Sequence, residues 1–267
     1  MKRLIYQVCL GQAKNSPLYK HCIGSVTEYC KKYGIDQFVQ ETPHLRIKPD
    51  IFLTNRSRES YEKHGGFLPI YEKENAFDCF TKGYDQIAII DADIYIRPDA
   101  PNIFDDFGTE HEFGACVERD MPISGQYAMK IKNYSQMQYA SLGDVDWDWQ
   151  DWGAKFYNMG LILMNKSIVP HFKGLNAKQF IERNEFKRFV DGVGNWKWST
   201  DQTLLNWWVK KEKVKVKDMD WKWNALYKGV KDEYIPEAHF VHFFLKDKLP
   251  NGGENVKQLM VDIGGNL

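Results

Sequence analysis

The sequence predicts an α/β protein: one domain with a central mixed, mostly parallel sheet and helices on its faces. Short apolar runs typical of strands alternate along the chain with segments of helical periodicity, an order that favours a parallel or mixed sheet. The run at residues 87–90 is apolar throughout and rich in β-branched side chains, as expected of a central strand buried on both faces. No internal repeat or low-complexity linker divides the 267 residues.

The individual elements follow in chain order. Predicted strands cover residues 4–10, 36–40, 87–90, 113–117, 156–164, 214–217 and 240–244. Predicted helices cover residues 17 to about 33, 68–82 and 200–211. Segments 41–66 and 121–151 lack a clear periodicity, so we expect irregular loops there. The second would be a long excursion of the kind that often carries function.

Capping residues support two of the helix starts. We expect Ser16 to be the N-cap of the first helix, with Pro17 at its first position, where the missing N–H costs nothing. Ser199 or Thr200 is expected to cap the helix at 200–211, with Asp201 in its first turn.

Two further patterns concern packing. The helix at 68–82 is expected to bury Tyr71, Phe77 and Phe80. Gly160 interrupts an apolar strand, which indicates that another group approaches the backbone closely at that point.

Composition argues against several classes of function. A hydrophobic content of 43% is enough for a full core, and 36 basic residues against 36 acidic ones give no net charge. We therefore expect no nucleic-acid partner and no anionic-membrane patch. Five cysteines without paired metal-binding spacing favour a reducing compartment, and we expect a cytoplasmic protein. No apolar run is long enough to span a bilayer.

The strand at 87–90 ends in Asp91-Ala92-Asp93. In an open α/β sheet, ligands bind at the carboxyl edge of the central strands. Two carboxylates at that edge can turn toward one hard cation, whose remaining coordination sites take phosphate oxygens. The sequence thus predicts a metal-diphosphate site, and the alternative is a strand that ends in an acidic turn. Other Asp-x-Asp copies, which we expect to be solvated loop carboxylates, occur at Asp144/Asp146, Asp146/Asp148 and Asp218/Asp220.

Four separated segments carry a resemblance to a known family. They are Asp91-Ala92-Asp93, the strand Phe156-Tyr157-Asn158-Met159-Gly160, the helix start Ser199-Thr200-Asp201-Gln202, and His242-Phe243 with Lys248 six residues after the histidine. In this order and spacing, they resemble GT-A-type glycosyltransferases, and most of all the family 8 group with glycogenin and the bacterial lipopolysaccharide galactosyltransferases. The family has Gly and Pro where this chain has Leu245 and Leu249, which leaves Lys246 as an alternative to Lys248.

The resemblance implies a single GT-A (Rossmann-like nucleotide-diphospho-sugar transferase) domain. Residues 1–120 would form its nucleotide-binding half, and residues 121–267 would complete the metal and acceptor sites. Asp91, Asp93 and His242 would coordinate a divalent ion, most often Mn²⁺, although Mg²⁺ is possible. A ligand set of two carboxylates and one imidazole suits Mn²⁺ better than Mg²⁺, because Mg²⁺ prefers oxygen ligands alone. The alternative for His242 is a core histidine that a backbone carbonyl satisfies.

The donor implied by the resemblance is a nucleotide sugar, most readily a UDP-hexose, and the acceptor is a hydroxyl of a glycan or glycoconjugate. Catalysis would depend on Asp201, which holds sugar hydroxyls, and on Gln202, whose carbonyl oxygen lies near the anomeric carbon. The remaining donor contacts would come from Leu10, Gly11, Tyr19, Lys73 (with Lys82 as the alternative), Asp91, Ala92, Asp93, Asn158 and Lys248.

The same resemblance implies retention of anomeric configuration, which needs no dedicated base. An inverting enzyme would need one, and Asp120, Asp148 or Asp151 could serve. The Trp-rich segments 147–152 and 196–198 are equally compatible with an acceptor platform and with core packing. Two other classes stay open from the residues alone: a metal-dependent phosphatase or nucleotidyltransferase, and a non-catalytic sugar-binding protein.

Overall fold

The predicted alternation of strands and helices is present in the computed structural model, which describes residues 1–50, 62–197 and 199–266. The strands are β1 (Arg3–Val8), β2 (Asp36–Gln40), β3 (Gln86–Ile90), β4 (Ile94–Ile96), β5 (Phe113–Val117), β6 (Tyr157–Asn165), β7 (Val216–Met219), β8 (Ala225–Leu226) and β9 (Phe240–His242). The α-helices are α1 (Pro17–Tyr33), α3 (Ile103–Phe107), α4 (Gly125–Tyr139), α5 (Ala177–Ile181), α6 (Lys187–Asp191), α7 (Asp201–Lys211) and α8 (Val256–Ile263). The 3-10 helices are η1 (Gly11–Asn15), η2 (Pro69–Lys82), η3 (Glu118–Asp120), η4 (Lys166–Phe172), η5 (Asn184–Phe186), η6 (Gly194–Trp196), η7 (Trp221–Trp223), η8 (Asp232–Glu237), η9 (Lys246–Lys248) and η10 (Pro250–Gly253).

A six-stranded sheet with the order β2-β1-β3-β6-β5-β7 forms the centre of the protein. Strand β6 runs antiparallel to its neighbours β3 and β5, whereas β1 is parallel to β2 and β3, and β5 is parallel to β7. The sheet is therefore mixed and mostly parallel, as predicted. Every residue of β3 and β6 is buried, which accounts for the apolar runs at residues 87–90 and 161–164.

A second sheet, with the order β4-β9-β8, begins where the large sheet ends. The Asp91 N–H donates to the Gly160 carbonyl oxygen of β6 over 2.8 Å, and the Phe243 N–H donates to the Asp93 carbonyl oxygen over 3.0 Å. The antiparallel pairing of β4 with β9 brings His242 beside these aspartates. The peptide 91–93 thus lies at the junction of the two sheets and is held by backbone hydrogen bonds at both ends.

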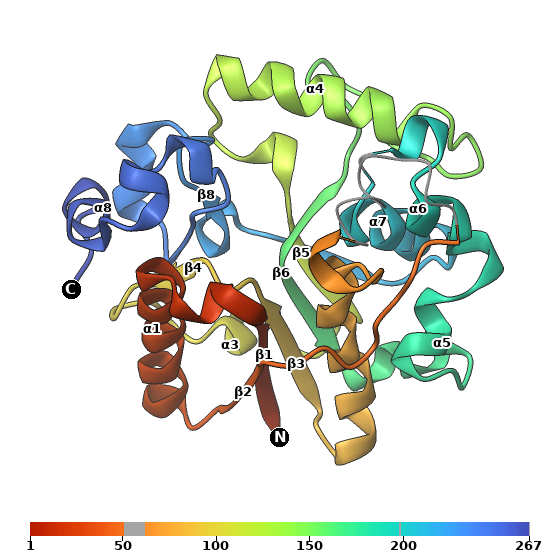
Figure 1. Ribbon diagram of the computed structural model, residues 1–267, viewed down its shortest axis with the longest axis horizontal. Coiled ribbons are helices and arrows are strands. Elements are labelled where there is room, and N and C mark those ends of the chain that lie inside the picture. Colours follow the sequence, from red (N-terminus) through yellow and green to blue (C-terminus); the bar gives the residue numbers. More distant parts are fainter. Residues whose placement is uncertain (51–61, 198, 267) are drawn as a thin grey trace.

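Helices lie on opposite sides of the central strands: α1 on one side, and α5, α6 and α7 on the other (Figure 1). Helix α1 begins at Pro17 as predicted, and Ser16 takes the N-cap position but makes no side-chain cap hydrogen bond. The helix ends at Gly34, whose φ of 63° is in the left-handed region that glycine adopts without strain. Thr200 caps α7, because its hydroxyl accepts from the Gln202 N–H over 3.2 Å.

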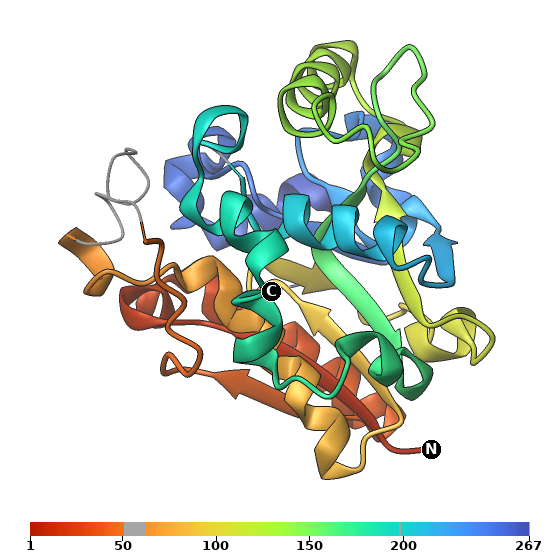
Figure 2. The same ribbon diagram turned by 90° about the vertical axis from the view of Figure 1, so that its right-hand side faces the viewer.

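The expectation of an irregular excursion at residues 121–151 is wrong, because α4 occupies much of it. This helix extends over the end of the molecule away from the N-terminus (Figure 2). Its buried face includes the polar Ser135 and Gln138, while Met129 and Met137 on the outer face are 50% and 38% exposed. Polar residues inside and apolar ones outside blur the periodicity that identifies an amphipathic helix.

Other differences are smaller. The segment 68–82 is helical but of the 3-10 type, and it buries Tyr71, Phe77 and Phe80 as predicted. The predicted edge strand at 214–217 is shifted to Val216–Met219, where it does form an edge of the large sheet. Of the segment 41–66, residues 51–61 lie outside the described chain.

Two general features complete the fold. All five cysteines are buried and unpaired. Among the described residues, none of the helices combines the length and the apolar character that crossing a membrane requires.

Gly160 is required by close packing, as the sequence indicates. A Cβ atom there would lie 2.3 Å from Cε1 of His242 and 2.7 Å from its Nδ1. We therefore expect Gly160→Ala to lower the free energy of unfolding by about 1–3 kcal/mol, measured by urea denaturation, because the buried ring must move. Gly24→Ala in helix α1 is the control, since a Cβ there meets nothing within 4 Å. It should raise stability by roughly 0.5–1 kcal/mol, and equal effects of the two changes would contradict this packing argument.

Candidate functional site

A cavity of about 470 Å³ lies at the carboxyl ends of β1 and β3, and its volume is in the usual range for small-molecule sites. Five parts of the chain supply most of the residues that line the cavity. They are residues 8–10 after β1, residues 90–93 after β3, residues 158–160 in β6, residues 200–202 at the start of α7, and His242 at the end of β9. The cavity therefore occupies the sheet edge at which the sequence predicts ligand binding.

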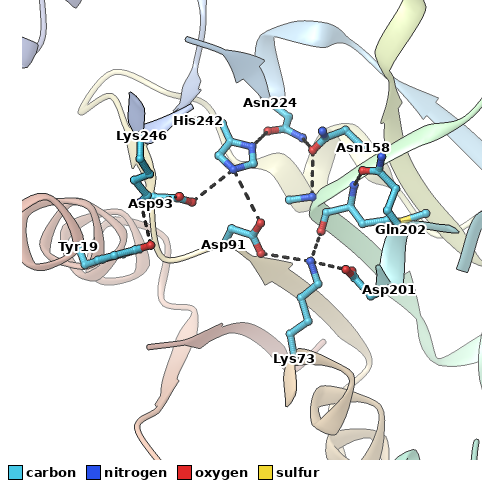
Figure 3. A network of polar contacts seen from close by, with 12 residues as sticks. Tyr19, Lys73, Asp91, Asp93, Asn158, Asp201, Gln202, Asn224, His242 and Lys246 are labelled. Atoms are coloured by element: carbon cyan, nitrogen blue, oxygen red, sulfur yellow. Dashed lines mark hydrogen bonds and ion pairs between the residues drawn. The ribbon is translucent and has the colours of Figure 1, made fainter. Parts of the chain in front are cut away.

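Three side chains that could hold a metal meet in this cavity. Each of Asp91, Asp93 and His242 offers one ligand atom, and these atoms all lie within 4.8 Å of one another. The His242 Nε2 is 3.3 Å from Asp93 Oδ1 and 3.7 Å from Asp91 Oδ2 (Figure 3). Two carboxylates and an imidazole nitrogen at such spacing form a donor set that fits a divalent transition metal such as Mn²⁺.

Two lysines offset the negative charge of this cluster. The Lys73 ammonium lies 3.2 Å from Asp91 Oδ1 and 2.9 Å from Asp201 Oδ2, and it also donates to the Met159 carbonyl oxygen over 2.6 Å. Burial alone would lower the pKa of Lys73, but the charges of Asp201 and Asp91 outweigh burial and raise it. Lys73 is therefore a buried cation that joins the end of β3 to the start of α7.

The second lysine, Lys246 in η9, reaches the other aspartate. Its Nζ lies 2.9 Å from Asp93 Oδ2 and donates to the Tyr19 hydroxyl over 2.8 Å. Burial opposes ionisation of Asp93, but His242 and Lys246 outweigh it and hold the pKa of Asp93 below its ordinary value. Burial dominates at Asp91, and the pKa of that carboxyl is raised although Lys73 and His242 lower it in part. The pKa values of these two neighbouring carboxyl groups are thus shifted in opposite directions.

The residues expected to hold the sugar also line the cavity. Asp201 is 3% exposed and paired with Lys73, and Gln202 Oε1 accepts from the Met159 N–H over 3.2 Å. Asn158 lies between them and His242, with its carbonyl oxygen accepting from the Gly160 N–H over 3.0 Å. The structure therefore brings these three side chains to the same cavity as the acidic cluster.

The first βα loop contributes two of its three expected residues. Leu10 and Tyr19 line the cavity with Ala92, whereas Gly11 begins η1, is exposed and does not line it. The positive φ of Gly11, 58°, gives it a role in turning the chain instead.

The expectation for Lys248 is not matched by its position. Lys248 is exposed and does not line the cavity, whereas Lys246, the alternative, contacts Asp93. Both lie in the short helix η9, whose turn directs only one of them toward the cluster. Lys82 is exposed, as expected of a surface lysine.

The aromatic and acidic residues at 144–152 do not line the cavity. Trp147 is 2% exposed and stacks on Tyr139, so it belongs to the core, while Trp149 and Trp152 are exposed. Trp196 packs against Phe189, and Trp198 lies outside the described residues.

The acids considered as bases for an inverting reaction do not line the cavity either. Asp148 and Asp120 pair with Arg119, and Asp151 is exposed. Every aspartate of the other Asp-x-Asp copies is exposed, but the expectation that all of them lie in loops is wrong for Asp218, which belongs to the edge strand β7.

Sequence reasoning missed two polar residues behind the cluster. Glu118 and Asn224 are buried, and both hydrogen-bond to Asn158. Glu118 directly follows β5, so the strand-end argument that singled out Asp91 could have found it. Asn224 stands among tryptophans and lysines, a context without a local signal.

No protein-family model matches the sequence, and no curated protein matches it either. Solved structures are similar in fold. A glycosyltransferase involved in the glycosylation of the major capsid of PBCV-1 has a TM-score of 0.55 at 13% identity, over 97% of this chain and 100% of that one. Mouse xyloside xylosyltransferase 1 has a TM-score of 0.50 at 12% identity, over 94% and 100%. The galactosyltransferase LgtC has a TM-score of 0.49 at 14% identity, over 97% and 95%.

At such identities, the first two likenesses establish the fold. The chain has the GT-A glycosyltransferase fold that the sequence resemblance implies.

The pairing of Lys73 leads to a stability prediction. Replacing its buried ammonium, as in Lys73→Met, leaves the Asp91 and Asp201 carboxylates without their cation. We expect the free energy of unfolding to fall by about 3 kcal/mol, as measured by guanidinium denaturation at neutral pH. Lys82→Met, on the same helix but exposed, is the matched control and should change stability by less than about 0.5 kcal/mol. A similar loss in both variants would show that the buried ion pairs are not responsible.

Proposed function

We propose that the protein is a metal-dependent glycosyltransferase that moves a hexose from a UDP-sugar to a hydroxyl of a glycan or other acceptor, with retention of configuration. The observation that carries the proposal is the meeting of two residue sets in one cavity. Asp91, Asp93 and His242 line the same cavity as Asp201 and Gln202, within a fold shared with glycosyltransferases. The first set suits a diphosphate-bound metal, and the second suits the sugar attached to it.

The metal would be held by Asp91, Asp93 and His242. A divalent ion there, most readily Mn²⁺, would supply Lewis-acid stabilisation of the charge that develops on the leaving nucleoside diphosphate. The protein itself offers a cation that can offset that negative charge, because Lys246 pairs with Asp93, one of the residues that line the cavity. We therefore assign to Lys246 the diphosphate contact that the sequence alone attributes to Lys248.

Asp201 and Gln202 would act on the transferred sugar. Asp201 is fixed by Lys73, so its carboxylate can accept hydrogen bonds from sugar hydroxyls without rearrangement. The Gln202 carbonyl oxygen is oriented by the Met159 N–H and offers partial negative charge toward an oxocarbenium-like ring carbon. Asn158 would add an amide contact in the same cavity.

The acidic residues that line the cavity favour a reaction with retention of configuration. Among the described residues lining the cavity, the acidic ones are Asp91, Asp93 and Asp201, and each of them is paired with a lysine. The acids considered as bases for inversion do not line the cavity. A mechanism in which the acceptor attacks the face that the diphosphate leaves requires no separate base, so it fits this lining best.

A calorimetric titration of UDP, GDP and CMP tests the proposal, each with Mn²⁺ and with chelator. We expect UDP to bind selectively and only with Mn²⁺, and Asp93→Asn to weaken that binding by at least about tenfold, or 1.4 kcal/mol. The matched control is Asp146→Asn, in an exposed Asp-x-Asp copy, which should bind like the unmodified protein. If no nucleotide binds under any condition, a phosphatase or a sugar-binding protein becomes the better reading, and donor hydrolysis without transfer would favour the former.

Replacing Lys246 is expected to change the affinity for free Mn²⁺ and the affinity for UDP with Mn²⁺ in opposite directions. In the structure its ammonium compensates Asp93, so it competes with a metal that binds alone. Lys246→Met should therefore bind Mn²⁺ several-fold more tightly in the absence of nucleotide, by roughly 1 kcal/mol. The same variant should bind UDP with Mn²⁺ more weakly, because the diphosphate loses a cation.

Electron paramagnetic resonance of free Mn²⁺ and calorimetry measure the two affinities. Lys248→Met, two residues further on and exposed, is the control and should change neither. Parallel losses of both affinities in Lys246→Met would contradict the competition.

A further inference from the structure

We propose that Asn224 is a positioning residue that fixes the tautomer of His242 and so presents the Nε2 lone pair to the metal. The inference deepens the proposed function, since it assumes that His242 is a metal ligand. It depends on a chain of hydrogen bonds that begins at the backbone of Gly160 and ends at the His242 ring, by way of Asn158 and Asn224 (Figure 3).

The chain has three links of ordinary length. The Gly160 N–H donates to Asn158 Oδ1 over 3.0 Å, and Asn224 Nδ2 donates to the same oxygen over 2.9 Å. Asn224 Oδ1 then lies 3.0 Å from His242 Nδ1. Asn224 is fully buried, and Asn158 and His242 are 7% and 4% exposed, so water has little access to replace any link.

The direction of every link follows from the first. A backbone N–H can only donate, so the Asn158 group that faces Gly160 must be its carbonyl oxygen. That oxygen can only accept, so Asn224 must turn its NH₂ group toward Asn158 and its carbonyl oxygen toward His242. An oxygen facing Nδ1 requires a proton on Nδ1. In the neutral ring, Nε2 then carries the lone pair.

The other end of Asn158 confirms this orientation independently. Its NH₂ group donates to Glu118 Oε2 over 3.1 Å, and the Tyr127 hydroxyl donates to the second oxygen of the same carboxyl. A reversed Asn158 would place its carbonyl oxygen against the Glu118 carboxylate and its NH₂ group against the Gly160 N–H. Each such mismatch of buried groups costs about 1–3 kcal/mol, so the chain has one favoured direction.

The consequence lies at the far side of the ring. Nε2 faces Asp93 Oδ1 at 3.3 Å and Asp91 Oδ2 at 3.7 Å. Because Nδ1 keeps its proton toward Asn224, Nε2 is the ring nitrogen that can offer its lone pair when a divalent cation, rather than a proton, lies between the ring and the two carboxylates. Asn224 does not line the cavity, so its influence on a metal passes through His242.

The test uses Asn224→Leu, which removes the acceptor for Nδ1–H, and Asn224→Asp, which keeps one. The matched control is Asn165→Leu. Asn165 is also buried and hydrogen-bonded, but it lies at the opposite end of β6 and bonds to Gln86 and to the carbonyl oxygens of Gly108 and His111. Unfolding measurements on all three variants separate a general loss of stability from the specific effect.

The first readout needs no metal and no activity. Proton–nitrogen correlation spectra of the neutral imidazoles report the tautomer, and the His242 signals are assigned by their loss in His242→Asn. We expect Nδ1–H in the unmodified protein and in Asn224→Asp, and a shift toward Nε2–H in Asn224→Leu. A neutral His242 ring that carries its proton on Nε2 instead of Nδ1 in the unmodified protein would overturn the inference, even if Asn224→Leu does not fold.

The second readout is Mn²⁺ affinity by paramagnetic resonance. Asn224→Leu should weaken it about 10–100-fold, the usual effect of removing a hydrogen-bond partner behind a metal ligand, while Asn165→Leu should not. Equal weakening in both variants, or none in Asn224→Leu, would also overturn the inference. If the unmodified protein binds no Mn²⁺, the proposed function fails, and the tautomer spectra still decide whether Asn224 controls the His242 ring.

Discussion

The site depends on how the peptide Asp91-Ala92-Asp93 is held between two sheets. Its first N–H donates to the Gly160 carbonyl oxygen beside the large sheet, and its last carbonyl oxygen accepts from the Phe243 N–H beside the small one. These bonds continue the ladders of β3 with β6 and of β4 with β9. Backbone hydrogen bonds do not depend on side-chain identity, so the direction of the two carboxylates is a property of the whole fold.

Holding three acids so close together requires compensating charge. Lys73 bridges Asp91 and Asp201, and Lys246 pairs with Asp93. Buried ions are costly unless they are paired, and burial raises the pKa of Asp91 although Lys73 and His242 lower it in part. A further cation beside Asp91 would favour its charged form, and Asp91, Asp93 and His242 each offer one ligand atom that could hold such an ion.

The parts of the fold that local signals specify were predictable from the sequence. The apolar runs of β3 and β6, the Pro17 start of α1 and the Thr200 cap of α7 each combine a strong propensity with a position in the pattern. Helix α4 was not predictable in this way. The polar side chain of Ser135 can be buried because its hydroxyl accepts a hydrogen bond from the Ala154 N–H, which lies outside the helix. The residue pattern within the helix itself does not indicate that contact.

By itself, the sequence determined the fold class and the strand end at which two aspartates stand together, because apolar runs and the aspartates that follow them are local properties of the chain. Only the tertiary structure decided the rest of the site. It placed His242 beside residues about 150 positions earlier, brought Lys246 rather than Lys248 into contact with Asp93, and put Asn224 against the histidine ring. These choices follow from the pairing of distant strands and the direction of buried hydrogen bonds, which no short stretch of sequence contains.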